Sequence, residues 1–527
     1  MSFEFAWHPE AWQLVAPILA VVGTALVVMV GDLFLKPPSW TGPTLLGLAV
    51  AMALAVSHWN VPLPGAEAAL AGALRLDRFA VFLQVAILGC AALSLLGAQS
   101  YNARAGIDRA EFHLLLLFST AGMLVLVASA DLITMFLGLE LLSFPAYVLC
   151  GFLRQQIKSN EAALKYFVLG SFASSVFLYG VALVWGATGS TQLAEIARAA
   201  ETPLFHLGAL LVVVGFLFKV GVVPFHMWVP DVYEGAPTPV TMFMAAAVKV
   251  AAFGALTRTL LGGALHTTLP LGSILWWFAA LTMTVGNMSA LTQDNIKRML
   301  AFSSVAHAGY MLVGLAAVAT LGSEQGASAV LYYLLAYAAM NIGAFTVVTL
   351  LGRRAEGDLR FDRDWSGVAQ RHPGLSLAMA LFMIALGGLP PTAGFFGKYA
   401  LFRAALDAHL TSLVVIAVLN TLVSVYYYLR VVVAMYMKPE REPVSGVLEG
   451  LLSRTHAFEG PGAMAATPAV EKPPEPRLAE AGHWGPRLAI VTCVLLTLWL
   501  GVGPGIGRLP GLTQIMEWAE AAVASLR

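Results

Sequence analysis

Charged residues inside apolar runs are the feature of this sequence that could carry chemistry. Lys219 lies in an otherwise uncharged run of residues 207–229. Three further ionisable residues lie in similar apolar runs: Glu140, Lys249 and Lys398. Burial disfavours the charged form of such groups and a nearby opposite charge favours it, so moving the partner changes the protonation state. Because ionisable residues inside membranes usually mark ion or proton pathways, these four suit a proton relay.

Two structural explanations stand beside the relay. A lysine near a helix end can keep its ammonium group at the membrane interface while its stem lies in lipid. Lys219 and Lys249 each lie about ten residues, or ~15 Å, from either end of their apolar segments, which is more than the side chain spans. A buried ion pair, for example between Glu140 and Lys219, is the second explanation. Three lysines to one glutamate cannot all be charged and paired at once, which favours groups that change protonation state.

His307 is a fifth candidate. Ser303 and Ser304 lie one turn before it in the same apolar segment, so hydroxyls and imidazole can line one helix face. A neutral imidazole accepts on one nitrogen and donates from the other, as a hydrogen-bonded proton wire requires. A core histidine with satisfied hydrogen bonds is the structural alternative.

Two residues are secondary candidates. His226 follows Lys219 by seven residues, and it either lines the mouth of the same cavity or caps a helix at the interface. Lys165 is spaced i,i+4 from Glu161, which predicts a surface salt bridge. Lys165 could instead modulate Glu140 from the neighbouring helix.

The elements that must position these residues are membrane helices. Of 527 residues, 59% are hydrophobic and 11% charged, against about 45–50% and about 25% in soluble domains. A membrane helix needs about 20 mostly apolar residues, and the sequence contains about fourteen such segments. Their approximate bounds are 11–35, 41–58, 77–100, 111–129, 131–153, 162–188, 206–229, 238–262, 272–291, 301–320, 327–351, 374–406, 410–437 and 487–503. The predicted fold class is an all-α polytopic membrane protein.

Helices 7 and 12 of this series are predicted to be broken. The seventh segment contains Pro224 and Pro230, and the twelfth contains LGGLPPTAGFFGK. Proline interrupts the helical hydrogen bonds, which lipid tolerates only where protein or a water-filled cavity satisfies the freed groups. The two breaks are five segments apart, so we expect two five-helix repeats, 111–262 and 263–437, in inverted orientation. Inverted repeats with matching interrupted helices are typical of transporters.

The rest of the predicted organisation consists of three N-terminal helices in residues 1–110, a Pro-rich cytoplasmic loop at 438–486, and a C-terminal helix with its tail at 487–527. Loops rich in Lys and Arg are expected on the cytoplasmic side, which places both termini in the periplasm. The opening residues MSFEFAWHPE carry no Lys or Arg, which argues against a cleaved signal peptide.

Several function classes are disfavoured by composition and motifs. Thirty basic residues balance thirty acidic ones, so there is no electrostatic case for binding nucleic acid. Three isolated cysteines, Cys90, Cys150 and Cys493, form no CxxC pair, so we expect neither an iron–sulfur cluster nor a structural zinc in this chain. No nucleotide-binding glycine motif is present either. Any energy source must therefore lie in another subunit or in an ion gradient.

Three motifs resemble the antiporter-like subunits of respiratory complex I, an NADH:quinone oxidoreductase. They are FKVGVVPFHMWVPDVYEGAPTPVT (218–241), LTQDNIKRMLAFSSVAHAGYM (291–311) and LGGLPPTAGFFGKYALF (386–402). DVYEGAPTPVT and the lysine at 398 are most similar to the subunit N branch. The resemblance implies fourteen helices, two inverted repeats and a midplane line of protonatable residues: Glu140, Lys219, Lys249, His307 and Lys398.

The same resemblance implies partners, cofactors and location. Subunits M and K are the expected neighbours, with membrane lipid around them, in a bacterial inner membrane. NADH, FMN, iron–sulfur clusters and quinone belong to partner subunits, because a distant peripheral arm oxidises NADH and reduces quinone. The implied function is proton translocation without a redox centre in this chain. A cation/proton antiporter subunit of the Mrp type, or the membrane arm of a related hydrogenase or photosynthetic complex, is the alternative.

Overall fold

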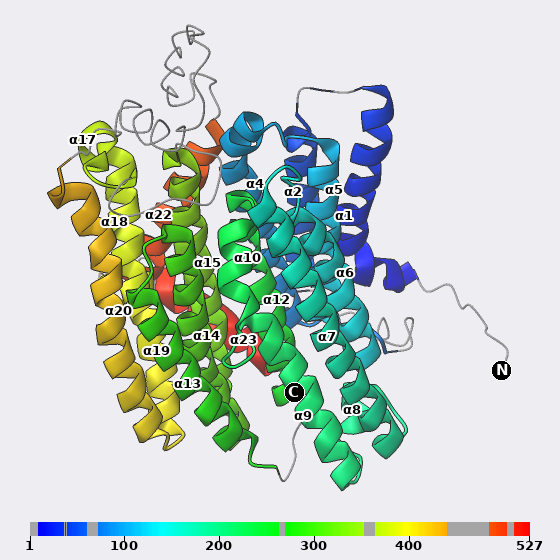
Figure 1. The fold of residues 1–527 in the computed structure, drawn as a ribbon. Coiled ribbons are helices and arrows are strands. Elements are labelled where there is room, and N and C mark those ends of the chain that lie inside the picture. Colours follow the sequence, from blue (N-terminus) through cyan, green and yellow to red (C-terminus); the bar gives the residue numbers. More distant parts are fainter. Residues whose placement is uncertain are drawn as a thin grey trace, which may run out of the picture.

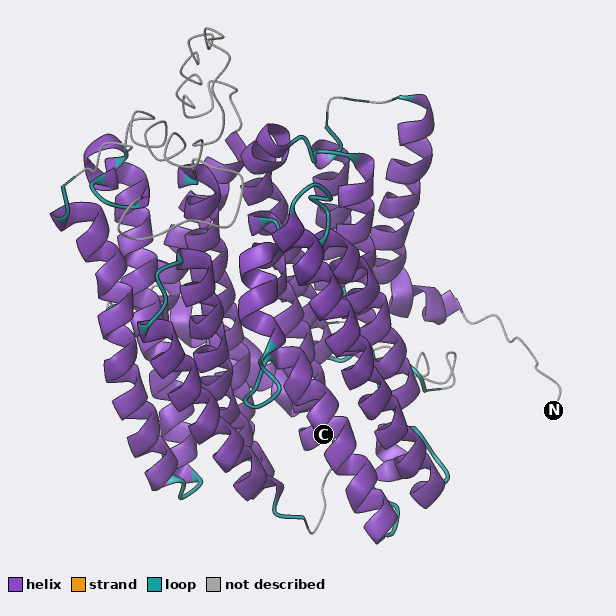
Figure 2. Ribbon diagram, in the orientation of Figure 1, coloured by secondary structure: helices purple, strands orange, loops and turns teal. Residues whose placement is uncertain are grey.

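Every regular element in the described part of the chain is a helix, as the apolar sequence predicts (Figure 2). The structure is a computed structural model that describes residues 9–35, 37, 39–60, 72–262, 269–352, 364–439, 484–502 and 511–526. Within these residues the only β-type pairing consists of two isolated bridges, Leu74 with Ser129 and Asp131 with Gln192. The predicted all-α membrane fold is confirmed.

Twelve helices in the described residues are long and apolar enough to cross a membrane. They are α1 (Pro9–Phe34), α4 (Arg78–Ala105), α5 (Ala110–Ala128), α6 (Leu132–Cys150), α7 (Ile157–Thr188), α9 (Pro203–Val220), the continuous helix of α11 (Thr238–Phe243), η1 (Met244–Val248) and α12 (Lys249–Leu261), then α13 (Leu271–Leu291), α14 (Ile296–Leu321), α15 (Glu324–Leu351), α20 (Thr411–Met437) and α22 (Trp484–Val502).

Shorter helices complete the described chain. Two are apolar, α2 (Thr41–Ser57) and α18 (Pro373–Gly387). The others are α8 (Leu193–Ile196), α10 (Trp228–Gly235), α17 (Val368–Arg371), α19 (Ala393–Asp407) and α23 (Gly511–Ala524). The total of about fourteen membrane helices, the inverted repeats and the domain bounds stay predictions. Residues 440–483 of the predicted Pro-rich loop lie outside the described residues.

Burial separates central helices from peripheral ones. The most apolar window of the helix Thr238–Leu261 is 100% buried, and those of α14 and α15 are each 83% buried. The corresponding windows are only 28% buried in α1 and 33% in α7, and α1 and α20 lie at opposite sides of the bundle (Figure 1). A helix that is apolar on every side packs inside the protein, so Lys249 and His307 are carried by central helices.

Side-chain caps fix where two of the relevant helices begin. Asp131 accepts a hydrogen bond from the backbone N–H of Thr134 at the start of α6. Asn295 accepts from the N–H groups of Lys297 and Arg298 at the start of α14. Such caps satisfy N–H groups that the first helical turn leaves unpaired. The starting points of the helices that carry Glu140 and His307 are therefore set by local sequence.

Glycines let α13 and α14 approach closely. A Cβ atom on Gly286 would lie 2.7 Å from the backbone nitrogen of Ala306, and one on Gly309 would lie 2.7 Å from that of Met283. Small residues at such positions are the usual means by which membrane helices pack backbone against backbone. His307, between these contact points, is thereby held against α13.

Candidate functional site

The break predicted at Pro224 separates α9 from α10, and Lys219 is the penultimate residue of α9. Gly221 ends α9 with φ +77°, a conformation that favours glycine. Two backbone groups near the break, the N–H of Val223 and the carbonyl of Phe218, have hydrogen-bond partners. The Val223 N–H donates to the Thr282 hydroxyl at 3.1 Å, and the Trp228 indole N–H donates to the Phe218 carbonyl at 3.1 Å. Protein groups thus satisfy the interrupted helix, as a membrane interior requires.

The Lys219 ammonium group is held by hydroxyls and aromatic rings. Its Nζ donates to Ser143 Oγ at 2.7 Å and to the Tyr166 hydroxyl at 3.1 Å. It also lies 5.1 Å from the centroid of the Tyr166 ring and 5.8 Å from that of Tyr147, within the range of cation–π attraction. Tyr166 in turn stacks on Trp228 of α10. The second half of the broken helix therefore supports the partner of the lysine in the first half.

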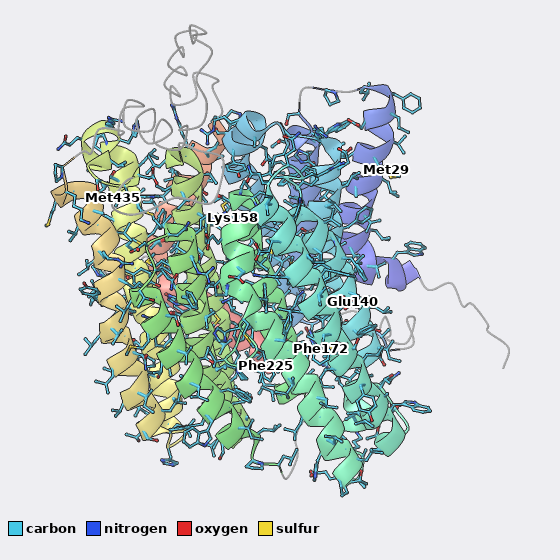
Figure 3. All side chains as sticks on the ribbon, in the orientation of Figure 1. Met29, Glu140, Lys158, Phe172, Phe225 and Met435 are labelled. Carbon is cyan, nitrogen blue, oxygen red and sulfur yellow. The ribbon has the colours of Figure 1, made fainter. Side chains whose placement is uncertain are left out.

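Glu140 lies on α6, three residues before Ser143 and near mid-height of the bundle (Figure 3). No ion pair within 4.0 Å joins Glu140 to Lys219 among the described residues. One carboxylate oxygen of Glu140 is buried without a hydrogen-bond partner, and the carboxylate still interacts electrostatically with Lys219. The structure therefore differs from a static buried pair. The Lys219 ammonium group donates to Ser143, while the carboxylate of Glu140 acts on it electrostatically without direct contact.

A small hollow lies beside Lys219 between α6, α7 and α9. Polar residues lining it include Ser143, Ser174 and Lys219 itself. His226, the secondary candidate, does not line this hollow, and it lies half-buried in the break between α9 and α10.

Lys249 opens α12 directly after the π-helical turn η1. Its side chain is 3% exposed, and its Nζ donates to the backbone carbonyl of Ser304 on α14. The ammonium also lies 5.4 Å from the centroid of the Tyr337 ring. Single π-helical turns occur frequently at functional sites.

His307 has a hydroxyl on each ring nitrogen. Nδ1 lies 2.6 Å from the Tyr333 hydroxyl and Nε2 lies 2.9 Å from the Tyr428 hydroxyl. Tyr428 also shares a hydrogen bond with Ser303. We call these four residues, His307, Ser303, Tyr333 and Tyr428, the His307 cluster. Every partner of the imidazole in this cluster both donates and accepts protons.

Lys398 lies after the break in its predicted segment, on α19, whereas Lys219 lies before the break in its segment, on α9. Gly388, with φ +80°, ends α18, and Lys398 follows in α19. Its Nζ donates to the carbonyls of Leu386 and Gly387 at 3.2 Å each, at the C-terminal end of α18 where the helix dipole is negative. The ammonium also lies 4.6 Å from the centroid of the Tyr310 ring.

One face of α14 connects three of the predicted residues. Ser304, His307 and Tyr310 are spaced three apart, so they lie on the same side of the helix. Lys249 donates to the backbone carbonyl of Ser304, and Lys398 lies over the ring of Tyr310. Among the described residues Lys219 and Lys249 share no hydrogen-bond partner, so Lys219 and Glu140 form a separate group.

Lys165 belongs to a charge cluster at one end of the bundle. The predicted pair with Glu161 is present at 2.5 Å, but Lys165 also contacts Asp231 on α10 at 2.7 Å. We define the charge cluster as Lys158, Glu161, Lys165, Asp231, Glu234 and Arg298. Burial would raise the pKa of Asp231, but hydrogen bonds from Lys165 and Arg298 hold that pKa below its ordinary value. Lys165 thus contacts α10 and not Glu140.

Sequence reasoning missed the polar partners of the relay residues. Ser143, Tyr166, Tyr333 and Tyr428 stand at unremarkable positions in apolar helices. The acidic residues of DVYEG carry no signal of their own in the sequence, although Asp231 forms ion pairs with both Lys165 and Arg298. Their position directly after the broken seventh segment was the available signal.

Comparisons with known proteins show which family the chain resembles. A family model described as NADH:quinone oxidoreductase/Mrp antiporter matches residues 129–424. Subunit N of NADH-quinone oxidoreductase from Trichlorobacter lovleyi is 45% identical over 81% of this chain and 87% of its own length. Subunit N from Myxococcus xanthus is 39% identical, covering 97% and 96%.

Solved structures show the same fold. A chain of respiratory complex I from Thermus thermophilus with bound aureothin matches with a TM-score of 0.74 and 34% identity, over 93% of this chain and 98% of that chain. A chain of the Mrp complex from Dietzia sp. matches with a TM-score of 0.78 at 21% identity, over 99% and 98%.

The chain belongs to the NADH:quinone oxidoreductase/Mrp antiporter family of membrane proteins. Within that family its relatives are subunit N of NADH-quinone oxidoreductase, and the chain is a membrane subunit of this type. The resemblance found in the sequence is confirmed.

Proposed function

We propose that this chain translocates protons for NADH-quinone oxidoreductase through a buried relay. The relay comprises Glu140, Lys219, Lys249, His307 and Lys398. The observation that supports it best is the face of α14, where His307 has a hydroxyl on each nitrogen between contacts to Lys249 and Lys398. Hydroxyls and imidazole exchange donor and acceptor roles, so a proton can enter at one end and another can leave at the other.

In this relay, Glu140 and Lys219 form the part whose protonation state is switched by a change in their separation. Lys219 rests on two neutral hydroxyls, and Glu140 has a buried oxygen without a partner. If the two side chains move together, the charged form of both is favoured, and if they separate, burial favours the neutral forms. A conformational change that alters their separation therefore changes the number of protons bound.

In this proposal, other subunits of the complex supply the energy and hold the cofactors. Subunits M and K are the neighbours in a bacterial inner membrane, with both termini in the periplasm. NADH, FMN, iron–sulfur clusters and quinone belong to other subunits of the complex. The described residues contain no group of three or more His, Cys, Asp or Glu side chains that could hold a metal ion. Lys165 and His226 have supporting roles outside the main line of the relay.

Purification of the native complex tests this function. The complex should oxidise NADH with quinone, and proteoliposomes containing it should take up protons during turnover in sodium-free buffer. A complex that isolates without iron–sulfur subunits and moves protons only in exchange for Na⁺ would show the Mrp-type function instead. The similarity to the Mrp structure is at 21% identity and bears on the fold alone.

A further inference from the structure

Lys297 is a buried lysine that the proposed relay does not use. The residue is 1% exposed, although Arg298 directly after it belongs to the partly exposed charge cluster. The Lys297 ammonium group donates to the backbone carbonyl of Ala236 at 2.7 Å. Taking an ammonium group out of water has a large free-energy cost, so a buried lysine usually has a structural or functional role. The contact with Ala236 indicates what this role is.

Ala236 directly follows α10 and is fully buried. The α10 helix has only eight residues, which is shorter than helices that are stable on their own. Carbonyl groups at the end of a helix lack partners within it, and the helix dipole favours a cation there. Lys297 thus supplies a buried partner for the C-terminal end of α10.

Two ion pairs with Arg298 also anchor α10, but they lie nearer the surface. Asp231 contacts the Arg298 guanidinium group at 2.8 Å and Glu234 contacts it at 3.0 Å, and the side chains of these pairs are 18% to 33% exposed. Ion pairs that water reaches contribute little to stability. The contact of Lys297 is shielded from water, so it should contribute more to the position of α10.

The position of α10 determines the surroundings of Lys219 through two aromatic rings. Trp228 of α10 stacks on Tyr166, with 4.6 Å between the ring centroids and 11° between the ring planes. The Tyr166 hydroxyl accepts the hydrogen bond from Lys219 at 3.1 Å. A shift of Trp228 would therefore move a hydroxyl group that contacts the relay lysine.

The same helix reaches the surroundings of Lys249 through Tyr233. This residue of α10 is 2% exposed, and its ring packs edge-on against Trp228 with 6.2 Å between the centroids. The Tyr233 hydroxyl faces the hydroxyl of Ser304. The backbone carbonyl of Ser304 accepts the hydrogen bond from Lys249. One short helix therefore positions groups beside both relay lysines.

We propose that Lys297 is a positioning residue for the relay. It holds the C-terminal end of α10, and α10 places the Tyr166 hydroxyl beside Lys219 and the Tyr233 hydroxyl beside Ser304. In this role Lys297 keeps its charge and passes no proton. The inference rests on the proposed relay.

Substitutions of Lys297 separate positioning from proton transfer. Lys297→Met keeps an unbranched side chain but removes the charge and the donor, so NADH-driven pumping by the complex in proteoliposomes should fall severalfold. Lys297→Arg keeps donors and a charge that arginine does not lose, so it should pump at no less than about half the wild-type rate. A lysine that carried protons itself could not be replaced in this way. Lys158→Met, at a half-exposed lysine that contacts Glu234, is the matched control and should pump normally.

A double-mutant cycle tests whether Lys297 acts through the two hydroxyl groups. A complex with Tyr166→Phe and Tyr233→Phe keeps both rings and should retain part of the pumping, because Lys219 still donates to Ser143. Adding Lys297→Met to this complex should cause little further loss, since residues that act through one another are not additive. A further loss by the same factor as in the wild-type background would overturn the proposal.

Gly235→Ala moves α10 without changing any polar side chain. The new Cβ atom would collide with the backbone carbonyl of Lys158, so α10 must shift and pumping should again fall severalfold. This variant decides the matter if Lys297→Met does not assemble. Normal pumping by an assembled Lys297→Met or Gly235→Ala complex would overturn the proposal, and so would an equal loss in Lys297→Arg and Lys297→Met.

Failure of the relay itself would appear differently, as normal pumping by an assembled Lys219→Ala complex.

Discussion

The ammonium group of Lys219 contacts Ser143 on α6 at 2.7 Å, and not the carboxylate of Glu140 one turn earlier on the same helix. The lysine therefore rests on a neutral partner while its potential counter-ion lies nearby with a buried, unpartnered oxygen. A short movement of the Lys219 side chain along α6 would exchange one partner for the other. This arrangement suits a group that must change its charge, because a permanent ion pair would hold both members ionised.

Replacing Lys219 by alanine should abolish most NADH-driven proton pumping while the complex still assembles. Removal of a positioned proton-transfer group typically costs about 10²–10⁴ in rate, so pumping well below a tenth of the wild-type level is expected. Pumping is measured as dye quenching in vesicles, and assembly on a native gel. Lys158→Ala, at a half-exposed lysine, is the matched control and should pump normally. Normal pumping by an assembled Lys219→Ala complex would remove Lys219 from the relay.

Glu140→Gln should cause a similar loss, for a different reason. The amide keeps the size of the side chain but cannot carry the charge that favours protonated Lys219. Pumping and NADH:quinone activity should fall together, and Glu140→Asp should restore part of both. Glu111→Gln, at an exposed position in the first turn of α5, serves as the control. Full coupled activity in Glu140→Gln would show that Glu140 has a structural role only.

The sequence predicted the helices and the ionisable residues, but not the partners of those residues. Hydropathy places Lys219 and Lys398 inside membrane segments, and the prolines predict both breaks, because these signals are local. The hydroxyl on His307 Nε2 comes from Tyr428, 121 residues later in the chain. Such a contact depends on how distant helices pack, and a tyrosine in an apolar helix carries no local signal for it.

Lys165 shows the same limit at shorter range. The i,i+4 rule predicted its pair with Glu161, since both lie on one helix face. Its contact with Asp231 required the position of α10, which follows from the break and not from residue spacing. The α10 helix thus joins the charge cluster through Asp231, a residue for which the sequence pattern predicted no contact.

The charge cluster should make stability depend on pH through Asp231. The pKa of this carboxyl lies below its ordinary value of 3.8, because hydrogen bonds from Lys165 and Arg298 outweigh the opposite effect of burial. The folded protein thus binds this proton more weakly than the unfolded chain does. The stabilisation is complete above pH 3.8 and is lost as the pH falls through the lowered pKa.

Asp231→Asn removes this dependence. At neutral pH the variant complex should lose its structure at a lower temperature than the wild type, and the difference should shrink as the pH falls below 3.8. The measurement is the thermal transition of the purified complex at a series of pH values. A temperature difference that stays constant across the series would mean that the carboxylate does not contribute through its charge.

Close packing of α13 against α14 gives a prediction independent of charge. In Gly309→Ala the new Cβ atom would lie 2.7 Å from the backbone nitrogen of Met283 and 3.2 Å from the Ala279 carbonyl. Neither backbone atom can turn away, so the helices must separate, at a cost of about 1–3 kcal/mol for overpacking. The variant should therefore dissociate or unfold at a lower temperature than the wild-type complex.

Gly23→Ala is the matched control, because nothing lies within 4 Å of its added Cβ atom in α1. Alanine there should be neutral or slightly stabilising, since glycine in a helix interior costs about 0.5–1 kcal/mol relative to alanine. Both variants are compared by heating the purified complex and following its thermal transition. Equal transition temperatures for Gly309→Ala and Gly23→Ala would contradict the close approach of α13 to α14 on which the position of His307 depends.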